Sequence, residues 1–237
     1  MFVYKYRSGE KYDFDSLKHN QFWASTSKEL NDPCEGIVNS KYIKFGLNLL
    51  GKLFGIDSVE ERKFIEQNAV DVLSFNLEKG IYSLSKTPLD ELLWAHYSNS
   101  HKGFCIQYDL DKLLQTDGIL ISDSVRYSDD PPEIPYTDIL PKNSDSHMKK
   151  SGFFKSKRWE YEEEYRIITD KFGLNTYSQD AIKGIYFGLK MSTNHINQIL
   201  EIFKGKKIDF YKIALEQNSY KLKSVKLENL KMFSTPN

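Results

Sequence analysis

The sequence lacks several features that would assign it to a class of protein at once. It has no apolar run approaching the roughly 20 residues that a membrane-spanning helix needs, and Lys5 and Arg7 interrupt its first hydrophobic segment. Its 2 cysteines, Cys34 and Cys105, have no metal-site spacing and fit a reduced chain better than a disulfide scaffold. No signal peptide opens the sequence. We therefore expect a cytoplasmic protein with no membrane contact.

An excess of charge of one sign is also missing. The 237 residues include 33 Lys and Arg and 33 Asp and Glu, which gives a formal net charge of zero. No global field therefore draws the protein to nucleic acid or to a membrane surface, and any such contact has to come from a local patch.

Aromatic residues, by contrast, are plentiful. The 15 Tyr and 15 Phe are enough to fill a core and still line a cleft with rings. The length suits one α+β domain over residues 1–237, and the apolar patterns predict a mixed or antiparallel central sheet. Helical spacing predicts a helical insertion at about 41–79, and a stretch rich in Pro, Asp and Ser predicts a long loop at about 128–150.

A serine-bearing strand, a helix and a second strand follow one another closely in Ser83–Asp109. Side chains alternate along a strand, so Ser83 and Ser85 share one face of the strand predicted over Ile81–Ser85. The second strand is predicted over Phe104–Asp109, where apolar and polar side chains alternate. We expect the polar groups of this unit to gather where the elements meet.

Two histidines and a lysine accompany the helix of this unit. Thr87 offers an N-cap, and the apolar stripe that follows ends in His96 and Tyr97. His101 and Lys102 then lead into the next strand. Together, these titratable and cationic groups could bind an anion or move a proton. The alternative is a hydrogen-bonded core histidine followed by two ordinary loop residues.

The first strand carries a candidate anion ligand. Residues Phe2–Arg7 alternate, which puts Tyr4 and Tyr6 on one face and Lys5 and Arg7 on the other. Arg7 at the end of the strand could form a bidentate contact with a phosphate or a carboxylate. The commoner alternative is a surface arginine.

A strong turn signal follows the strand predicted over Gln21–Ser27. Asn31, Asp32 and Glu35 lie close together around an Asn-Asp-Pro turn, and loops after strands often carry binding groups. Asn and Asp at turns more often serve backbone hydrogen bonds, so both readings stay open.

The segment Trp159–Ile168 is the second candidate site. Its alternating aromatic residues predict a strand with Glu162, Glu164 and Arg166 on one face. Neighbours on that face are separated by about 7 Å, so their pKa values depend on one another. Such a face needs a cationic partner, a substrate or a metal. The alternative is a solvated acidic face paired with Lys155, Lys157 and Arg158.

Four blocks of this sequence resemble the bacterial family named domain of unknown function 2971. They are YKYRS, FWASTSKELNDPCEG, the run SLS with LLWAHYSNSHKGFCIQYD, and KSKRWEYEEEYRI, and they cover most of residues 1–190. The name of the family supplies no reaction.

A weaker resemblance is to ADP-ribosyltransferases, which place an Arg or His on a first strand, a Ser or Tyr on a middle strand and a Glu late in the chain. It implies an ADP-ribosyltransferase-like fold, NAD as substrate, and an ADP-ribosyltransferase or NAD glycohydrolase-like enzyme of a bacterial conflict or phage-defence system. Arg7 would hold phosphate or ribose, Ser83 or Ser85 would line the nicotinamide pocket with Tyr97, and Glu164 would be the catalytic carboxylate. The acceptor would be a protein or a nucleic acid.

Two other functions are compatible with the same residues. In metal-assisted phosphodiester hydrolysis the oxygen ligands would be Asp32, Glu35, Glu162 and Glu164, helped by His101 or Lys102. In a non-enzymatic sensor module, cationic side chains would recognise a phosphorylated, nucleotide-like ligand and aromatic rings would stack its base.

The expected site is the one that the ADP-ribosyltransferase resemblance implies, and it contains no metal. The candidate catalytic residues are Glu164, Glu162, His96 and His101. The candidate substrate-binding residues are Tyr6, Arg7, Ser25, Asn31, Asp32, Glu35, Ser83, Ser85, Trp94, Tyr97, Lys102, Trp159 and Arg166.

Overall fold

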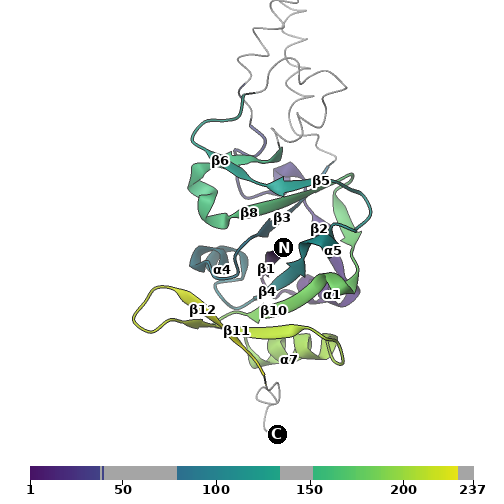
Figure 1. Cartoon of the computed structure of the whole chain (residues 1–237), viewed down its shortest axis with the longest axis vertical. Helices are drawn as coiled ribbons and strands as arrows, with labels where there is room; N and C mark the ends of the chain where they lie inside the picture. The colour runs from purple at the N-terminus through teal and green to yellow at the C-terminus, as the bar shows by residue number, and fades with distance from the viewer. Residues whose placement is uncertain (38, 40–78, 134–151, 229–237) are drawn as a thin grey trace, which may run out of the picture.

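The structure is a computed structural model that describes residues 1–37, 39, 79–133 and 152–228 (Figure 1). An eight-stranded sheet dominates it, in the order β12-β11-β10-β4-β1-β3-β8-β5. Its strands are β1 (Phe2–Arg7), β3 (Gly80–Ser85), β4 (Phe104–Asp109), β5 (Ile119–Ser124), β8 (Glu164–Thr169), β10 (Ile182–Phe187), β11 (Asp209–Leu215) and β12 (Leu222–Lys226).

The sheet is mixed, which confirms the predicted α+β class. β10 and β11 are parallel, whereas the other neighbouring strands are antiparallel. Parallel neighbours need a crossover, and helix α7 (Thr193–Ile202) supplies it. Ser192 caps this helix by accepting a hydrogen bond from the His195 amide, and Ile196 and Ile199 are buried on its inner face.

Smaller elements surround the sheet. Among the described residues, the other helices are α1 (Lys11–His19), α4 (Glu91–Tyr97) and α5 (Leu110–Leu113), with 3-10 turns η1 (Ser27–Glu29), η4 (Lys157–Glu162) and η5 (Gln179–Ala181). In the same part of the chain, β2 (Gln21–Ala24) pairs with β9 (Gly173–Thr176), and β6 (Arg126–Ser128) pairs with β7 (Phe154–Ser156). α1 and β9 have no counterpart among the predicted elements.

Strand β1 separates two parts of the hydrophobic core. Val3 belongs to a large cluster that also contains Phe14 of α1 and Ile196 of α7. Tyr4 and Tyr6 belong to a second cluster on the other side, where they meet α4. The alternation predicted for Phe2–Arg7 is therefore confirmed, and it sets two distinct faces at the centre of the sheet.

Local turn chemistry corrected two predicted boundaries. The helix predicted from a Thr87 cap begins at Glu91, because the Asp90 carboxylate accepts the Leu93 amide at 2.8 Å and makes Asp90 the N-cap. The strand predicted over Trp159–Ile168 is half wrong. Its first part is the turn η4, and β8 begins only after Glu163, which adopts a left-handed conformation.

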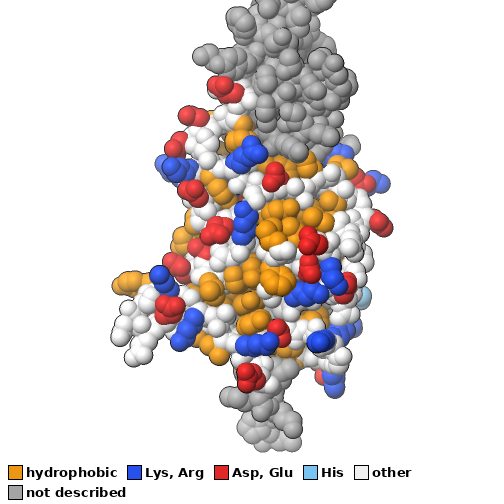
Figure 2. Space-filling model, in the orientation of Figure 1, with side chains coloured by type: hydrophobic (Ala, Val, Ile, Leu, Met, Phe, Trp, Pro, Cys, Tyr) orange, Lys and Arg blue, Asp and Glu red, His pale blue; other side chains and the backbone are white. Residues whose placement is uncertain are grey.

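Two predicted features lie mostly outside the described residues. The helical insertion falls almost wholly within 40–78, and most of the loop at about 128–150 falls within 134–151. Among the described helices, none has the length and apolar character needed to cross a membrane. On the face shown in Figure 2, acidic and basic side chains are interspersed among hydrophobic ones, in keeping with the balanced charge of the chain.

The close approach of Gly103 to β1 gives a test of the fold. A Cβ at this position would overlap the Arg7 carbonyl oxygen and lie 2.8 Å from the Ser8 carbonyl carbon, so backbone has to move. We expect Gly103→Ala to lower the free energy of unfolding by about 2–3 kcal/mol, measured by urea denaturation. In Gly184→Ala the nearest atom is Oε1 of the flexible Gln107 side chain, so the loss should be smaller. Equal losses would contradict the packing described.

Candidate functional site

A pocket opens in the sheet where β1 and β3 separate. These two strands are paired at Tyr4 and Ser85, whereas β1 pairs with β4 along its whole length. Three consecutive residues of β1, from Tyr4 to Tyr6, line the opening, and Ser83 and Ser85 line it from β3. The empty space of the cavity, including the part open to solvent at its mouth, is about 820 Å³.

The register across three strands brings polar side chains to this pocket. Tyr4 of β1 lies opposite Ser85 of β3, and Ser85 lies opposite Glu164 of β8. Ser83 lies opposite Arg166 one step along. Directly paired residues project from the same face of a sheet, so the structure brings Ser83, Ser85, Glu164 and Arg166 together as the sequence predicted.

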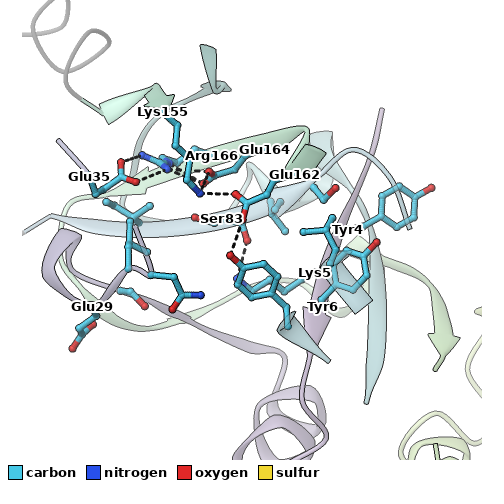
Figure 3. Close-up of a pocket in the computed structure, with 18 of the residues that line it drawn as sticks. Tyr4, Lys5, Tyr6, Glu29, Glu35, Ser83, Lys155, Glu162, Glu164 and Arg166 are labelled. Atoms are coloured by element: carbon cyan, nitrogen blue, oxygen red, sulfur yellow. Dashed lines mark hydrogen bonds and ion pairs between the residues drawn. The ribbon is translucent and has the colours of Figure 1, made fainter. Parts of the chain in front are cut away.

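The side chain of Arg166 organises one wall of the pocket. Its Nε and Nη2 donate to the two oxygens of Glu164 at 2.9 and 3.0 Å. Its Nη1 and Nη2 donate to the two oxygens of Glu35, the second at 3.2 Å, and Nη1 also reaches the Gly152 carbonyl at 2.7 Å. A guanidinium has five N–H donors, and all are engaged. Figure 3 shows this group as a chain of dashed contacts.

Lys155 extends the network to the second glutamate. Its Nζ donates to Glu162 at 2.5 Å and to Glu164 at 3.4 Å, and it stands 4.6 Å from the centre of the Trp159 ring. The other oxygen of Glu162 accepts the Tyr97 hydroxyl at 2.6 Å. Glu162 therefore joins α4 to the wall that β8 forms.

The environment fixes the charge of Glu164. Burial alone would raise the pKa of its carboxyl, but the charges of Arg166 and Lys155 outweigh burial, and the pKa lies below its usual value. For Lys155, burial opposes the charge, yet Glu164 and Glu162 raise its pKa. Glu35 is different, because burial dominates and raises its pKa despite the contact with Arg166. Glu164 is thus ionised at neutral pH and suited to stabilising positive charge.

Other lining residues come from β2 and the segment that follows it. Trp23, Ser25 and Asn31 reach the pocket from this side, and the Trp23 side chain is half exposed. Together with Tyr6 and Tyr97, Trp23 gives the cavity aromatic walls as well as polar groups.

The structure does not bring Arg7 to the pocket, which corrects the expected contact with a ligand there. Arg7 projects from the other face of β1, where its Nε is 3.4 Å from Asp13 of α1. The tyrosines that act on its charge are Tyr82, Tyr108 and Tyr177 of the large core cluster. The alternation along β1 therefore turns Arg7 into the interior.

The two histidines and Lys102 also lie elsewhere. His96 is exposed at the end of α4, and His101 stacks on Trp94 with ring centres 6.3 Å apart. Burial and the charge of Lys190 lower the pKa of His101. Lys102 lines a separate cavity. The helix stripe expected to carry His96 inward is instead rotated, with Leu93 and Trp94 buried.

Three further candidates support the site without lining it. Trp94 is fully buried and donates its ring N–H to the Pro88 carbonyl, and Trp159 packs against Lys155. Asp32 accepts the Cys34 amide at 2.9 Å, which is the turn role that was the alternative for this residue. Among the residues that the structure describes, no three His, Cys, Asp or Glu side chains group as metal ligands, so the four expected carboxylates do not form a joint set.

Several lining residues were not among the candidates. The sequence did indicate a role for Lys155 near Glu162 and Glu164, because Lys155 was named as a partner of the acidic face in the alternative interpretation. Lys5 had none, since alternation assigns it to the face of Arg7 and only the opening between β1 and β3 gives it access. The remaining unexpected lining residues are Tyr4, Trp23, Glu29, Leu30, Ile81, Leu84 and Leu93.

The opposite pKa shifts of Glu164 and Glu35 predict unequal costs of neutralising them. Because the fold favours the charge of Glu164, Glu164→Gln should lower the free energy of unfolding at pH 7 by about 3–5 kcal/mol. Glu35→Gln should cost less, because burial penalises that charge. Glu201→Gln, in an exposed ion pair with Lys204, should change little. Urea denaturation of the three variants measures this order, and a larger loss for Glu35→Gln would contradict it.

Comparison with known proteins adds one finding. No curated protein and no solved structure matched the chain. A family model described as Protein of unknown function (DUF2971) matches residues 93–167, a segment that runs from α4 into β8 and includes Tyr97, Lys155, Glu162, Glu164 and Arg166. Over this segment the chain is therefore similar to the family whose resemblance its sequence blocks indicated.

Proposed function

We propose that this protein is an NAD-dependent ADP-ribosyltransferase or NAD glycohydrolase-like enzyme. The observation that carries the proposal is the row of Ser85 and Glu164 on adjacent strands beside β1, facing one pocket. The resemblance to ADP-ribosyltransferases implies a serine on a middle strand and a glutamate late in the chain, and these two residues lie side by side here, whereas Arg7, the expected residue of the first strand, faces the interior.

The chemistry of this reaction suits an ionised buried carboxylate. The bond between ribose C1′ and the nicotinamide nitrogen breaks, and its electron pair leaves with nicotinamide, which becomes neutral. The ribose develops oxocarbenium character, so a fixed negative charge beside it lowers the barrier. Glu164 is held ionised by Arg166 and Lys155 and is assigned this role.

The second glutamate is assigned to the acceptor. A water molecule, or a nucleophile of a protein or nucleic-acid acceptor, forms the new bond to C1′ and gives up a proton. Glu162 lines the pocket and is held in place by Tyr97 and Lys155. It would orient this acceptor, and the rings of Trp23 and Tyr97 would pack on the nicotinamide. Consumption of NAD⁺ in this way would suit a bacterial conflict or phage-defence system.

One observation favours the non-enzymatic alternative, a nucleotide-binding sensor module. Glu35, Glu162 and Glu164 already have cationic partners, as expected of a structural network. The two functions differ in turnover, because a sensor binds its ligand without releasing nicotinamide.

Release of labelled nicotinamide from NAD⁺ tests the proposal, and three consecutive glutamates provide matched variants. Glu164→Gln should lower the rate at least about 100-fold, because it removes the charge at the reacting sugar. Glu162→Gln should lower mainly transfer to the acceptor. Glu163→Gln is the control, because Glu163 is exposed and does not line the pocket.

Each variant should be assayed below its own unfolding temperature, since Glu164→Gln is expected to be less stable. Absence of nicotinamide release by the wild-type protein, or equal rates for Glu163→Gln and Glu164→Gln, would sink the enzymatic proposal. If NAD⁺ stabilises the protein against unfolding but no nicotinamide is released, the function as a nucleotide-binding sensor is favoured instead.

A further inference from the structure

The proposed substrate carries a diphosphate, and Arg7, the residue that was expected to bind it, does not line the pocket. Arg7 faces the interior beside Asp13. Arg166 has every donor engaged by Glu35, Glu164 and a carbonyl. Lys155 is shared between two glutamates. Arg7 does not line the pocket, Arg166 has no donor left for a phosphate, and the charge of Lys155 is already paired with two carboxylates.

Among the residues that the structure describes, Lys5 is the third cation that lines the pocket, beside Arg166 and Lys155. Its Nζ crosses the opening between β1 and β3 and donates to the Ser83 carbonyl at 2.8 Å. It also stands 4.9 Å from the centre of the Tyr82 ring. Within the described part of the chain Lys5 forms no ion pair, so its contacts are with neutral groups. Figure 3 shows Lys5 apart from the group around Arg166.

We infer that the ammonium group of Lys5 forms an anion-binding subsite of this pocket and takes a phosphate of the ligand. An ammonium group has three donors, of which the Ser83 carbonyl uses one. The remaining donors, on an ammonium group that has no ion-pair partner among the described residues, are what a phosphate oxygen requires. The identification of that phosphate with the diphosphate of NAD⁺ rests on the proposed function, whereas the subsite itself does not.

The charges around Lys5 couple this binding to pH. Burial, together with the charge of Arg7 on the same strand, lowers the pKa of Lys5 to about 8, although Glu164, Asp13 and Glu162 on the neighbouring elements act to raise it. Lys5 in turn acts on the buried thiol of Cys105 in β4. A bound phosphate adds negative charge beside Lys5 and raises its pKa. Binding is therefore favoured below this pKa and weakens as the pH rises from 7 to 9.

The test measures the affinity of ADP-ribose and of inorganic pyrophosphate for the full chain by calorimetry. Lys5→Met keeps the shape of the apolar part of the side chain and removes the ammonium group, and it should weaken binding of both ligands on the order of 10- to 100-fold. Lys223→Met is the control, because Lys223 is exposed on β12 and lines neither pocket. A thermal melt checks that Lys5→Met is folded.

The dependence of affinity on pH shows whether Lys5→Met weakens binding through loss of the charge or through loss of packing. Wild-type affinity for ADP-ribose should fall by up to about tenfold between pH 7 and pH 9, and that of Lys5→Met should stay flat. Binding of pyrophosphate that depends on Lys5, without binding of ADP-ribose, would uphold the subsite and refute the proposed substrate. Equal affinities of wild type and Lys5→Met, or no binding of either ligand to the wild type at millimolar concentration, would overturn the inference.

Discussion

Burial of one guanidinium constrains the whole site. Arg166 is fully buried in β8, and a buried charge without partners costs several kcal/mol. The chain meets this cost by bringing Glu35 from the segment after β2, Glu164 from the start of β8 and the Gly152 carbonyl to the same five donors. Segments far apart in the sequence are thereby fixed against one another, and the wall of the pocket is rigid because its charges have to stay paired.

The network around Arg166 gives the two sides of the pocket different electrostatic properties. The charges of Glu164, Lys155 and Arg166 hold one another, so that side of the cavity presents a fixed field rather than free ligands. The other side is the opening between β1 and β3. There the described contacts of Lys5 are all with neutral groups. A ligand with positive character at one end and a phosphate at the other matches this polarity.

The sequence predicted well what depends on local pattern and poorly what depends on how strands meet. Alternation gave β1 at its observed bounds, and the shared face of Ser83 and Ser85, because period two is a property of the strand itself. The same rule assigned Lys5 to the face of Arg7, and only the separation of β1 from β3, a tertiary feature, brings its ammonium to the pocket. Alternation also failed before Glu164, because a single left-handed residue ends η4 and resets the register.

A crystal structure of the protein with bound ADP-ribose would show whether Lys5 and the network around Arg166 hold the two ends of the ligand. We predict a phosphate oxygen within hydrogen-bonding distance of Lys5 Nζ, the ribose against Ser85 and Glu164, and Arg166 still paired with both of its glutamates. ADP-ribose bound away from the opening between β1 and β3, or bound there with its phosphates on Arg166 in place of Glu35 or Glu164, would contradict it.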